Sequence, residues 1–133
     1  MMTTTKTLSG VIAAITTAID DKGEPDSARS TALARFLLAN GCDGLNVLGT
    51  TGEATSFSLD QRKRVMSAYA ASGLPLDRMM VGTGAAALAD AIALTKHAAE
   101  LGFADHAHMA RTIRSATGQT PSACRALLAH EIS

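Results

Sequence analysis

Two loops rich in glycine and threonine carry the residues of this sequence that are best suited to binding a small anion. Residues 49–53 read Gly-Thr-Thr-Gly-Glu, and residues 82–84 read Gly-Thr-Gly. The hydroxyls of Thr50 and Thr51, with the backbone N–H groups that flanking glycines such as Gly52 leave accessible, can donate hydrogen bonds to a carboxylate. A carboxylate-binding loop is one interpretation, and a purely structural turn is the other.

Each of these loops follows a short apolar segment, and a third such segment lies near the start of the chain. Residues 11–17, 44–48 and 78–81 are apolar runs that predict buried strands. An uninterrupted apolar run is typical of a strand that is covered on both faces of a parallel sheet.

Helical patterns follow all three runs. We expect helices over about 27–40, 58–72 and 86–101, ended by Gly41, Gly73 and Gly102. Ser58 and Gln61 are spaced as a capping box at the start of the second helix. The inner side of the first helix is expected to hold Ala32, Leu33, Phe36, Leu37 and Leu38.

Three strand–helix pairs with short connections predict an α/β fold with a parallel sheet. A piece of a barrel and an open doubly wound sheet both fit this alternation. In either fold the loops after the strands meet at the carboxyl ends of the strands, where such folds place their ligand sites.

Composition narrows the classes of function. The 133 residues have a formal net charge of zero and only 3% aromatic residues, so no overall basic field attracts nucleic acid or anionic membrane. No signal peptide and no run of roughly 18 apolar residues is apparent. Cys42 and Cys124 form no redox or metal motif, and the four histidines do not make a chelating pattern, so we expect a cytoplasmic protein without metal or cofactor.

The run from Gly82 to Ala87 also matches the dinucleotide fingerprint G-x-G-x-x-A. That fingerprint normally lies in the first β/α unit and is completed by an acidic residue at the end of the next strand. No such strand is predicted here, so a tight strand-to-helix turn is the preferred interpretation.

Three stretches together resemble the N-terminal part of the dihydrodipicolinate synthase / N-acetylneuraminate lyase family. They are GVIAAITTAID, GCDGLNVLGTTGEATSFSLDQR and MMVGTGAAALADAIALTKHAAELGFA, and the resemblance covers residues 10–103. It implies a (β/α)8 TIM barrel of class I aldolases that act on pyruvate through a lysine Schiff base. It also implies that Thr50 and Thr51, with Gly52, hold the pyruvate carboxylate and that Thr50 joins a proton relay.

The sequence departs from the family pattern at several places. The usual Thr-Pro after the first strand is Thr17-Ala18, and the family's lysine and catalytic tyrosine lie on later strands that have no counterpart here. The lysines present (Lys6, Lys22, Lys63 and Lys96) and the single tyrosine, Tyr69, are not at predicted strand ends. Without an amine nucleophile a class I aldolase cannot form its covalent intermediate, so the chain alone is expected to be inactive.

The end of the chain has a second resemblance. GFADHAHMARTIRSATGQTPSACR, 102–125, is similar to the C-terminal helix-turn-helix of AraC-type transcription regulators, and the match begins near residue 98. Met109, Ile113 and Ala116 fall on one face of the predicted helix 103–118. The opposite face is polar and would enter a major groove. The expected DNA contacts are His108, Arg111, Thr112, Arg114, Ser115 and Arg125.

The sequence therefore predicts residues 1–103 as an incomplete aldolase barrel of three β/α units. Residues 104–133 are predicted as a helix-turn-helix-like tail that shares residues 86–101 as its first helix. The expected partners are a small pyruvate-like carboxylate, DNA at the tail, no membrane, and further copies of the chain at unclosed sheet edges. A DNA-binding regulator and a non-functional gene-fusion remnant are the alternatives to a lyase-family fragment.

Overall fold

A computed structural model describes residues 8–104 of the chain. Three parallel strands, β1 (Ile12–Ala14), β2 (Gly44–Val47) and β3 (Met79–Val81), form one sheet in the order β1-β2-β3. Ala13 lies opposite Leu45, and Leu45 lies opposite Met79. The predicted parallel sheet is therefore confirmed, with strands shorter than the apolar runs.

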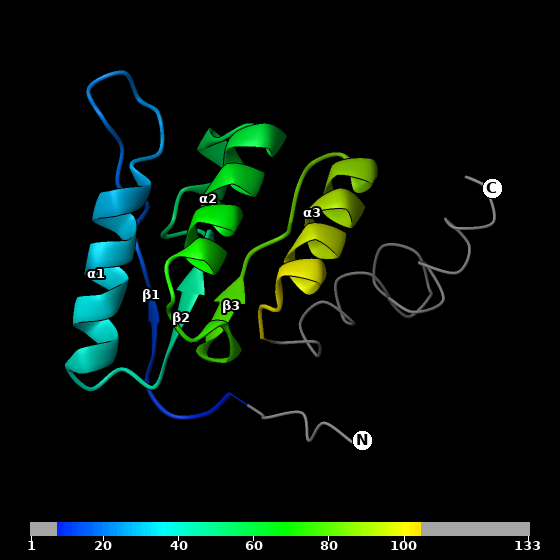
Figure 1. Ribbon diagram of the computed structural model, residues 1–133. Coiled ribbons are helices and arrows are strands. Elements are labelled where there is room, and N and C mark those ends of the chain that lie inside the picture. The colour runs from blue at the N-terminus through cyan, green and yellow to red at the C-terminus, as the bar shows by residue number, and fades with distance from the viewer. Residues whose placement is uncertain (1–7, 105–133) are drawn as a thin grey trace.

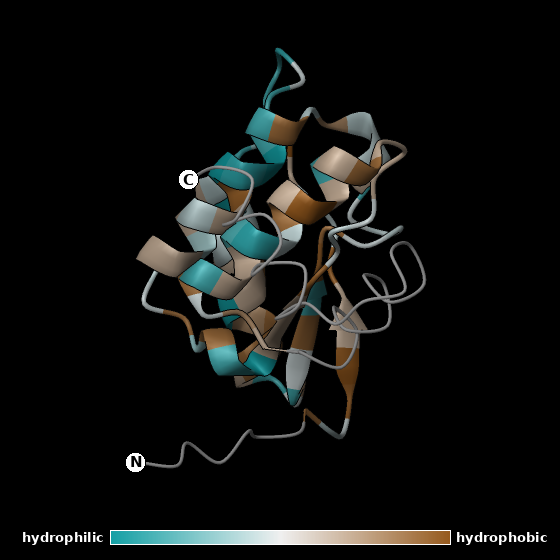
Figure 2. Ribbon diagram, turned by 90° about the vertical axis from the view of Figure 1, so that its right-hand side faces the viewer, coloured by the Kyte–Doolittle hydropathy of each residue, from teal (hydrophilic) through white to brown (hydrophobic). Residues whose placement is uncertain are grey.

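One helix follows each strand: α1 (Ser27–Ala39), α2 (Leu59–Ala71) and α3 (Leu88–Leu101). Short 3-10 turns, η1 (Ala54–Ser56) and η2 (Leu76–Arg78), precede α2 and β3. The three helices lie side by side over one face of the sheet (Figure 1), and the view turned by 90° shows the same separation of helices from strands (Figure 2). This is the arrangement of three consecutive units of a TIM barrel.

The core lies between the sheet and this helix layer. Its largest fully buried members include Leu45 on β2, Met79 on β3, Tyr69 on α2 and Leu94 on α3. Phe103, just after α3, is only 2% exposed and belongs to the same cluster. Because aromatic residues are scarce, the core is built mainly from branched aliphatic side chains and methionine, as the composition predicts.

Local signals set the start of α2 and the ends of the helices. Ser58 accepts a hydrogen bond from Gln61 N, and the Gln61 side chain accepts one from Ser58 N, which confirms the capping box. Gly41, Gly73 and Gly102 have φ values of +106°, +80° and +100°, the left-handed conformation that ends a helix most readily at glycine.

The predicted inner face of α1 is partly wrong. Ser30 and Ala34 are buried and Leu37 and Leu38 half-buried, but Ala32, Leu33 and Phe36 are exposed, Phe36 by 61%. Ser30 explains the difference, because its Oγ accepts a hydrogen bond of 3.0 Å from Ala18 N and its carbonyl faces the Tyr69 hydroxyl at 3.4 Å. These contacts turn the 30/34/37/38 face inward.

Candidate carboxylate site at the strand ends

Three loops meet at the carboxyl ends of the strands. The Thr17 hydroxyl, after β1, donates a 2.7 Å hydrogen bond to the carbonyl of Gly52, and this contact is buried. Gly82 N, after β3, donates a 2.8 Å hydrogen bond to the carbonyl of Val47 at the end of β2. Thr17 therefore holds the loop 49–53 and Gly82 is attached to the end of β2, which confirms the predicted meeting of the loops.

Glycine at position 82 has a packing role. A Cβ atom there would lie 2.1 Å from the carbonyl oxygen of Leu48, so only glycine lets the two loops approach this closely. Thr83, between the two glycines, is fully buried and accepts a 2.9 Å hydrogen bond from the Thr95 hydroxyl of α3. The Gly-Thr-Gly run is thus explained by loop-to-loop and loop-to-helix packing, without a nucleotide.

The backbone of the GTTGE loop is unusual at both ends. Leu48 and Glu53 each have a φ of +54°, a left-handed conformation that is rare for residues with a side chain. Inside the loop, Glu53 N donates to the Thr50 carbonyl at 3.0 Å and Ala54 N donates to the Gly49 carbonyl at 3.4 Å. Conformations of this kind gather at binding sites, where surrounding contacts hold them in place.

A pocket of about 200 Å³ opens beside this loop. Thr50 lines it together with Leu48, Gly49, Ala54, Thr55, Arg62, Gly82 and Gly84. Thr51 is exposed and does not line this pocket, whereas Gly52 is buried with its carbonyl bound to Thr17. Of the three predicted binding residues, the structure therefore brings Thr50 to the pocket.

Arg62 is a site residue that the sequence reasoning missed. Its side chain donates from Nη1 to the Gly84 carbonyl at 2.7 Å and from Nη2 to the Gly82 carbonyl at 2.8 Å. Arg62 is 4% exposed, and burial lowers the pKa of its guanidinium while the carboxylate of Asp90 opposes that shift. Arg62 could have been noticed because it shares the buried face of α2 with Val65, Met66 and Tyr69. A charged side chain on a buried face is costly and therefore often has a specific role.

A second cavity, of about 330 Å³, adjoins the pocket beside Thr50 and shares Ala54, Thr55, Arg62 and Gly84 with it. It is lined by Arg62 and Asp90 together with Ser58, Leu59, Leu94 and the small residues 84–87. Asp90 lines this cavity and not the pocket beside Thr50. Arg62 thus lines both hollows, whereas Asp90, the acid that compensates part of its charge, lines only the larger one.

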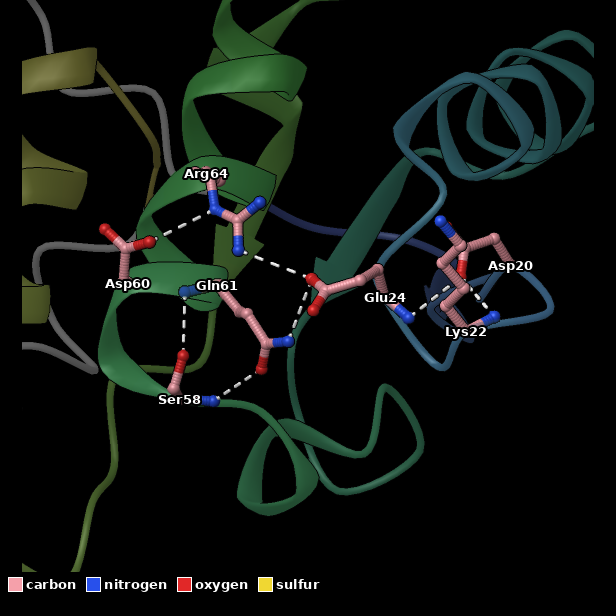
Figure 3. Close-up of polar contacts among 7 residues, drawn as sticks. All are labelled: Asp20, Lys22, Glu24, Ser58, Asp60, Gln61 and Arg64. Carbon is pink, nitrogen blue, oxygen red and sulfur yellow. Dashed lines mark hydrogen bonds and ion pairs between the residues drawn. The ribbon is translucent and has the colours of Figure 1, made fainter.

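The loop before α1 is fixed to the start of α2. Glu24 accepts a 3.0 Å hydrogen bond from Gln61 Nε2 and pairs with Arg64 at 3.4 Å (Figure 3). Gln61 is also the capping partner of Ser58, so one side chain serves both contacts. The ion pair is solvent-exposed and contributes little on its own, but the Gln61 contacts fix where the loop 49–58 ends.

None of the lysines within residues 8–104 lines the pocket beside Thr50. Lys63 lies on α2 and Lys96 on α3, as predicted, Lys22 is exposed in the turn before α1, and Lys6 lies outside the described residues. Tyr69 is buried on α2, which confirms that it is a packing residue. Within residues 8–104 there is no cluster of three metal-ligating side chains and no helix of the length and apolarity of a membrane span.

The predicted DNA contacts at the tail (His108, Arg111, Thr112, Arg114, Ser115 and Arg125) all lie outside the described residues. The helix-turn-helix stays a prediction from the sequence. Gly102 and Phe103, which fit both resemblances, serve the β/α part: Gly102 ends α3 and Phe103 is buried in its core.

Comparison with known proteins agrees with this geometry. The profile of the Dihydrodipicolinate synthetase family matches residues 7–110, which reaches past the predicted boundary at 103. A 4-hydroxy-tetrahydrodipicolinate synthase of Azoarcus sp. is 36% identical over 74% of this chain and 34% of its own. The corresponding enzyme of Listeria welshimeri is 37% identical over 74% of this chain.

Solved structures are similar over the same region. Proteus mirabilis N-acetylneuraminate lyase has a TM-score of 0.68 and 34% identity over 74% of this chain and 33% of its own. The dihydrodipicolinate synthase of Acinetobacter baumannii, solved in complex with pyruvate, has a TM-score of 0.64 and 31% identity over 73% of this chain. The chain spans about a third of the length of these relatives. Since the family profile covers residues 7–110 and relatives more than 30% identical match about three quarters of the chain, this chain belongs to the dihydrodipicolinate synthetase family.

Proposed function

We propose that the strand-end pocket binds the carboxylate of a small 2-oxo acid of the pyruvate type. The observation that carries the proposal is the pocket of about 200 Å³ formed by the GTTGE loop and the Gly82–Gly84 loop, with Thr50 in its wall. A hydroxyl and N–H groups beside a buried cation are suitable partners for a carboxylate. A similar chain, the Acinetobacter baumannii enzyme, was solved with pyruvate bound, which supports the choice of ligand.

The lyase chemistry of the relatives comes to this chain only as a further proposal. We propose that residues 8–104 supply the carboxylate-binding part of such a site and not its Schiff-base nucleophile. The lysines at 22, 63 and 96 do not line the pocket, and an amine in contact with the substrate carbonyl is what covalent aldol chemistry of this class requires. On this proposal the chain binds its ligand reversibly.

A titration followed by NMR tests the binding proposal. We expect pyruvate to shift the amide signals of the loops 48–53 and 82–84 in the wild-type chain. The Thr50→Val and Thr51→Val variants keep the side-chain shape but lose the hydroxyl, and Thr50→Val should weaken binding about threefold to tenfold, the usual effect of one lost hydrogen bond. Thr50→Val should have the larger effect because Thr50 lines the pocket.

Thr31→Val is the matched control. The Thr31 hydroxyl bonds to the carbonyls of Ser27 and Ala28 within α1, away from the pocket lining, so the affinity for pyruvate should not change. The proposal fails if the wild-type chain shows no shifts at either loop, or if both loop variants bind as the wild type does.

A further inference from the structure

Besides Thr50, the pocket wall contains Arg62, a buried cation that has no ion-pair partner within residues 8–104. Arg62 is 4% exposed and takes part in none of the salt bridges among the described residues. Burying a guanidinium costs free energy unless its charge is used or compensated. An apolar side chain at this position of α2 would be buried without that cost, so packing alone does not explain why the residue is an arginine.

The hydrogen bonds of Arg62 show what it fixes. Its two Nη atoms reach the carbonyls of Gly82 and Gly84, and these bonds attach the loop after β3 to the helix that follows the GTTGE loop. The Nε atom is buried with no partner among the described residues. Both carbonyl partners are neutral, so most of the positive charge remains available to the surroundings.

Asp90 lines only one of the two adjoining hollows, so their walls carry different charges. Asp90 lies in the wall of the larger cavity, while the wall of the pocket beside Thr50 contains Arg62 and no acidic residue. A charge on a side chain as buried as Arg62 acts through an effective dielectric well below that of water. The pocket beside Thr50 should therefore attract an anion.

We propose that Arg62 is a positioning residue of the pocket that has two effects. It holds the Gly82–Gly84 loop against the GTTGE loop, and its charge makes the pocket prefer an anionic ligand to a neutral one of the same shape. The inference deepens the proposed function and rests on it for the identity of the ligand class. Arg62 acts on the ligand through the loop and through its field, without forming a bond to the reacting atoms.

The charge effect is tested with two ligands of nearly equal shape, pyruvate and its neutral amide, pyruvamide. The wild-type chain should bind pyruvate more tightly. Arg62→Met should weaken pyruvate binding roughly tenfold more than it weakens pyruvamide binding, because only the charged ligand loses the attraction of a unit charge several ångströms away. Arg62→Lys should retain the preference for pyruvate.

Arg78 offers a matched control at the opposite ends of the strands. It also donates to two backbone carbonyls, from Nε to Asp43 at 2.7 Å and from Nη2 to Cys42 at 2.8 Å, but it does not line the pocket. Arg78→Met should leave the ratio of the two affinities unchanged. Equal weakening of both ligands by Arg62→Met would mean a purely structural role and would overturn the charge effect, as would equal binding of both ligands by the wild type.

The loop effect is tested without any ligand. Amide hydrogen exchange at residues 82–84 should become faster in Arg62→Met and stay at the wild-type rate in Arg78→Met. If Arg62→Met does not fold, Arg62→Gln repeats both measurements, because it removes the charge and keeps a short donor. Unchanged exchange in a folded Arg62 variant overturns the loop effect.

These outcomes separate this inference from the proposed function. If the wild-type chain binds neither ligand, the proposed function is wrong and the charge effect is wrong with it, while hydrogen exchange still decides the loop effect. If pyruvate binds and Thr50→Val weakens it but Arg62→Met does not, the proposed function stands and the charge effect of Arg62 is wrong.

Discussion

Leu48 and Glu53 hold left-handed backbone conformations on either side of Gly49–Gly52. Each costs on the order of 1 kcal/mol for a residue with a side chain, and surrounding contacts must offset that cost. The contacts are identifiable: Thr17 holds the Gly52 carbonyl, and Gly82 lies against Leu48. The loop that carries Thr50 is thus given its shape by residues from three different β/α units.

The lysine positions lead to a prediction about covalent chemistry. Treatment with pyruvate and borohydride should leave no stoichiometric adduct on a defined lysine, because no lysine of the described residues lines the pocket and an imine needs contact between the amine and the carbonyl. Peptide mapping by mass spectrometry is the measurement. A stoichiometric adduct on Lys63 or Lys96 would contradict it.

At this scale the sequence predicts residue types better than contacts. The Gly-Thr-Thr-Gly-Glu run is local, so its ligand-loop character could be read from composition and spacing. Arg62 could not be assigned in the same way, because its partners are carbonyls twenty and more positions away and every residue has a carbonyl. Thr50 lines the pocket and Thr51 does not. The loop geometry decides this, and two adjacent threonines cannot be told apart from the sequence alone.

Tyr69 joins two helices. It lies on the buried face of α2, and its hydroxyl approaches the Ser30 carbonyl of α1 at 3.4 Å. Burial raises the pKa of the phenol to about 12 from the ordinary 10, because the phenolate would lose its hydration. The helix layer is therefore more stable while this phenol is neutral than after it ionises.

Tyr69 predicts a loss of stability at alkaline pH. The folded-state pKa of Tyr69 lies above its unfolded-state pKa. The stabilisation that the neutral phenol gives the fold is therefore complete below pH 10 and is lost as the pH rises through 12. The free energy of unfolding should fall by about 2–3 kcal/mol over this window. Urea unfolding at several pH values measures it.

Tyr69→Phe is the control for that experiment. It keeps the ring in the core and removes the titrating hydroxyl, so its unfolding free energy should depend less on pH between 10 and 12. Lysine side chains titrate in the same range, and only the difference between the two proteins reports on Tyr69. Parallel curves for both proteins would contradict the assignment.

The helices could be located from the sequence because their ends are set by neighbours in the chain. Ser58 with Gln61 and the three left-handed glycines are signals of this kind. The inner face of α1 was predicted less well, since apolar residues occur around most of that helix. The contacts of Ser30 with Ala18 and Tyr69 decide which face is buried, and they come from distant positions.

The sheet has two open sides in the part of the chain that the structure describes. Within residues 8–104 only β2 has a strand on both sides, while β1 and β3 are edge strands. An edge strand presents unpaired N–H and C=O groups that invite another strand. Val11, next to β1, is also 62% exposed, which adds an apolar surface to one edge.

These edges predict self-association. The purified chain should elute as oligomers or as an expanded species in size-exclusion chromatography with light scattering, and the oligomer fraction should grow with concentration. A lysine placed on an edge commonly prevents such pairing, so Val11→Lys should reduce the association. A monodisperse monomer with a sharp thermal transition would contradict this prediction.

The order β1-β2-β3 also has a consequence for how the protein is made. Within residues 8–104, each strand pairs only with strands that are its immediate neighbours in chain order. As the chain leaves the ribosome, every new strand therefore meets a partner that has already been synthesised and does not have to wait for a distant segment. The loop that carries Thr50 would acquire its contact with Thr17 first and its contact with Gly82 last, so the pocket would be completed only when the third unit has emerged.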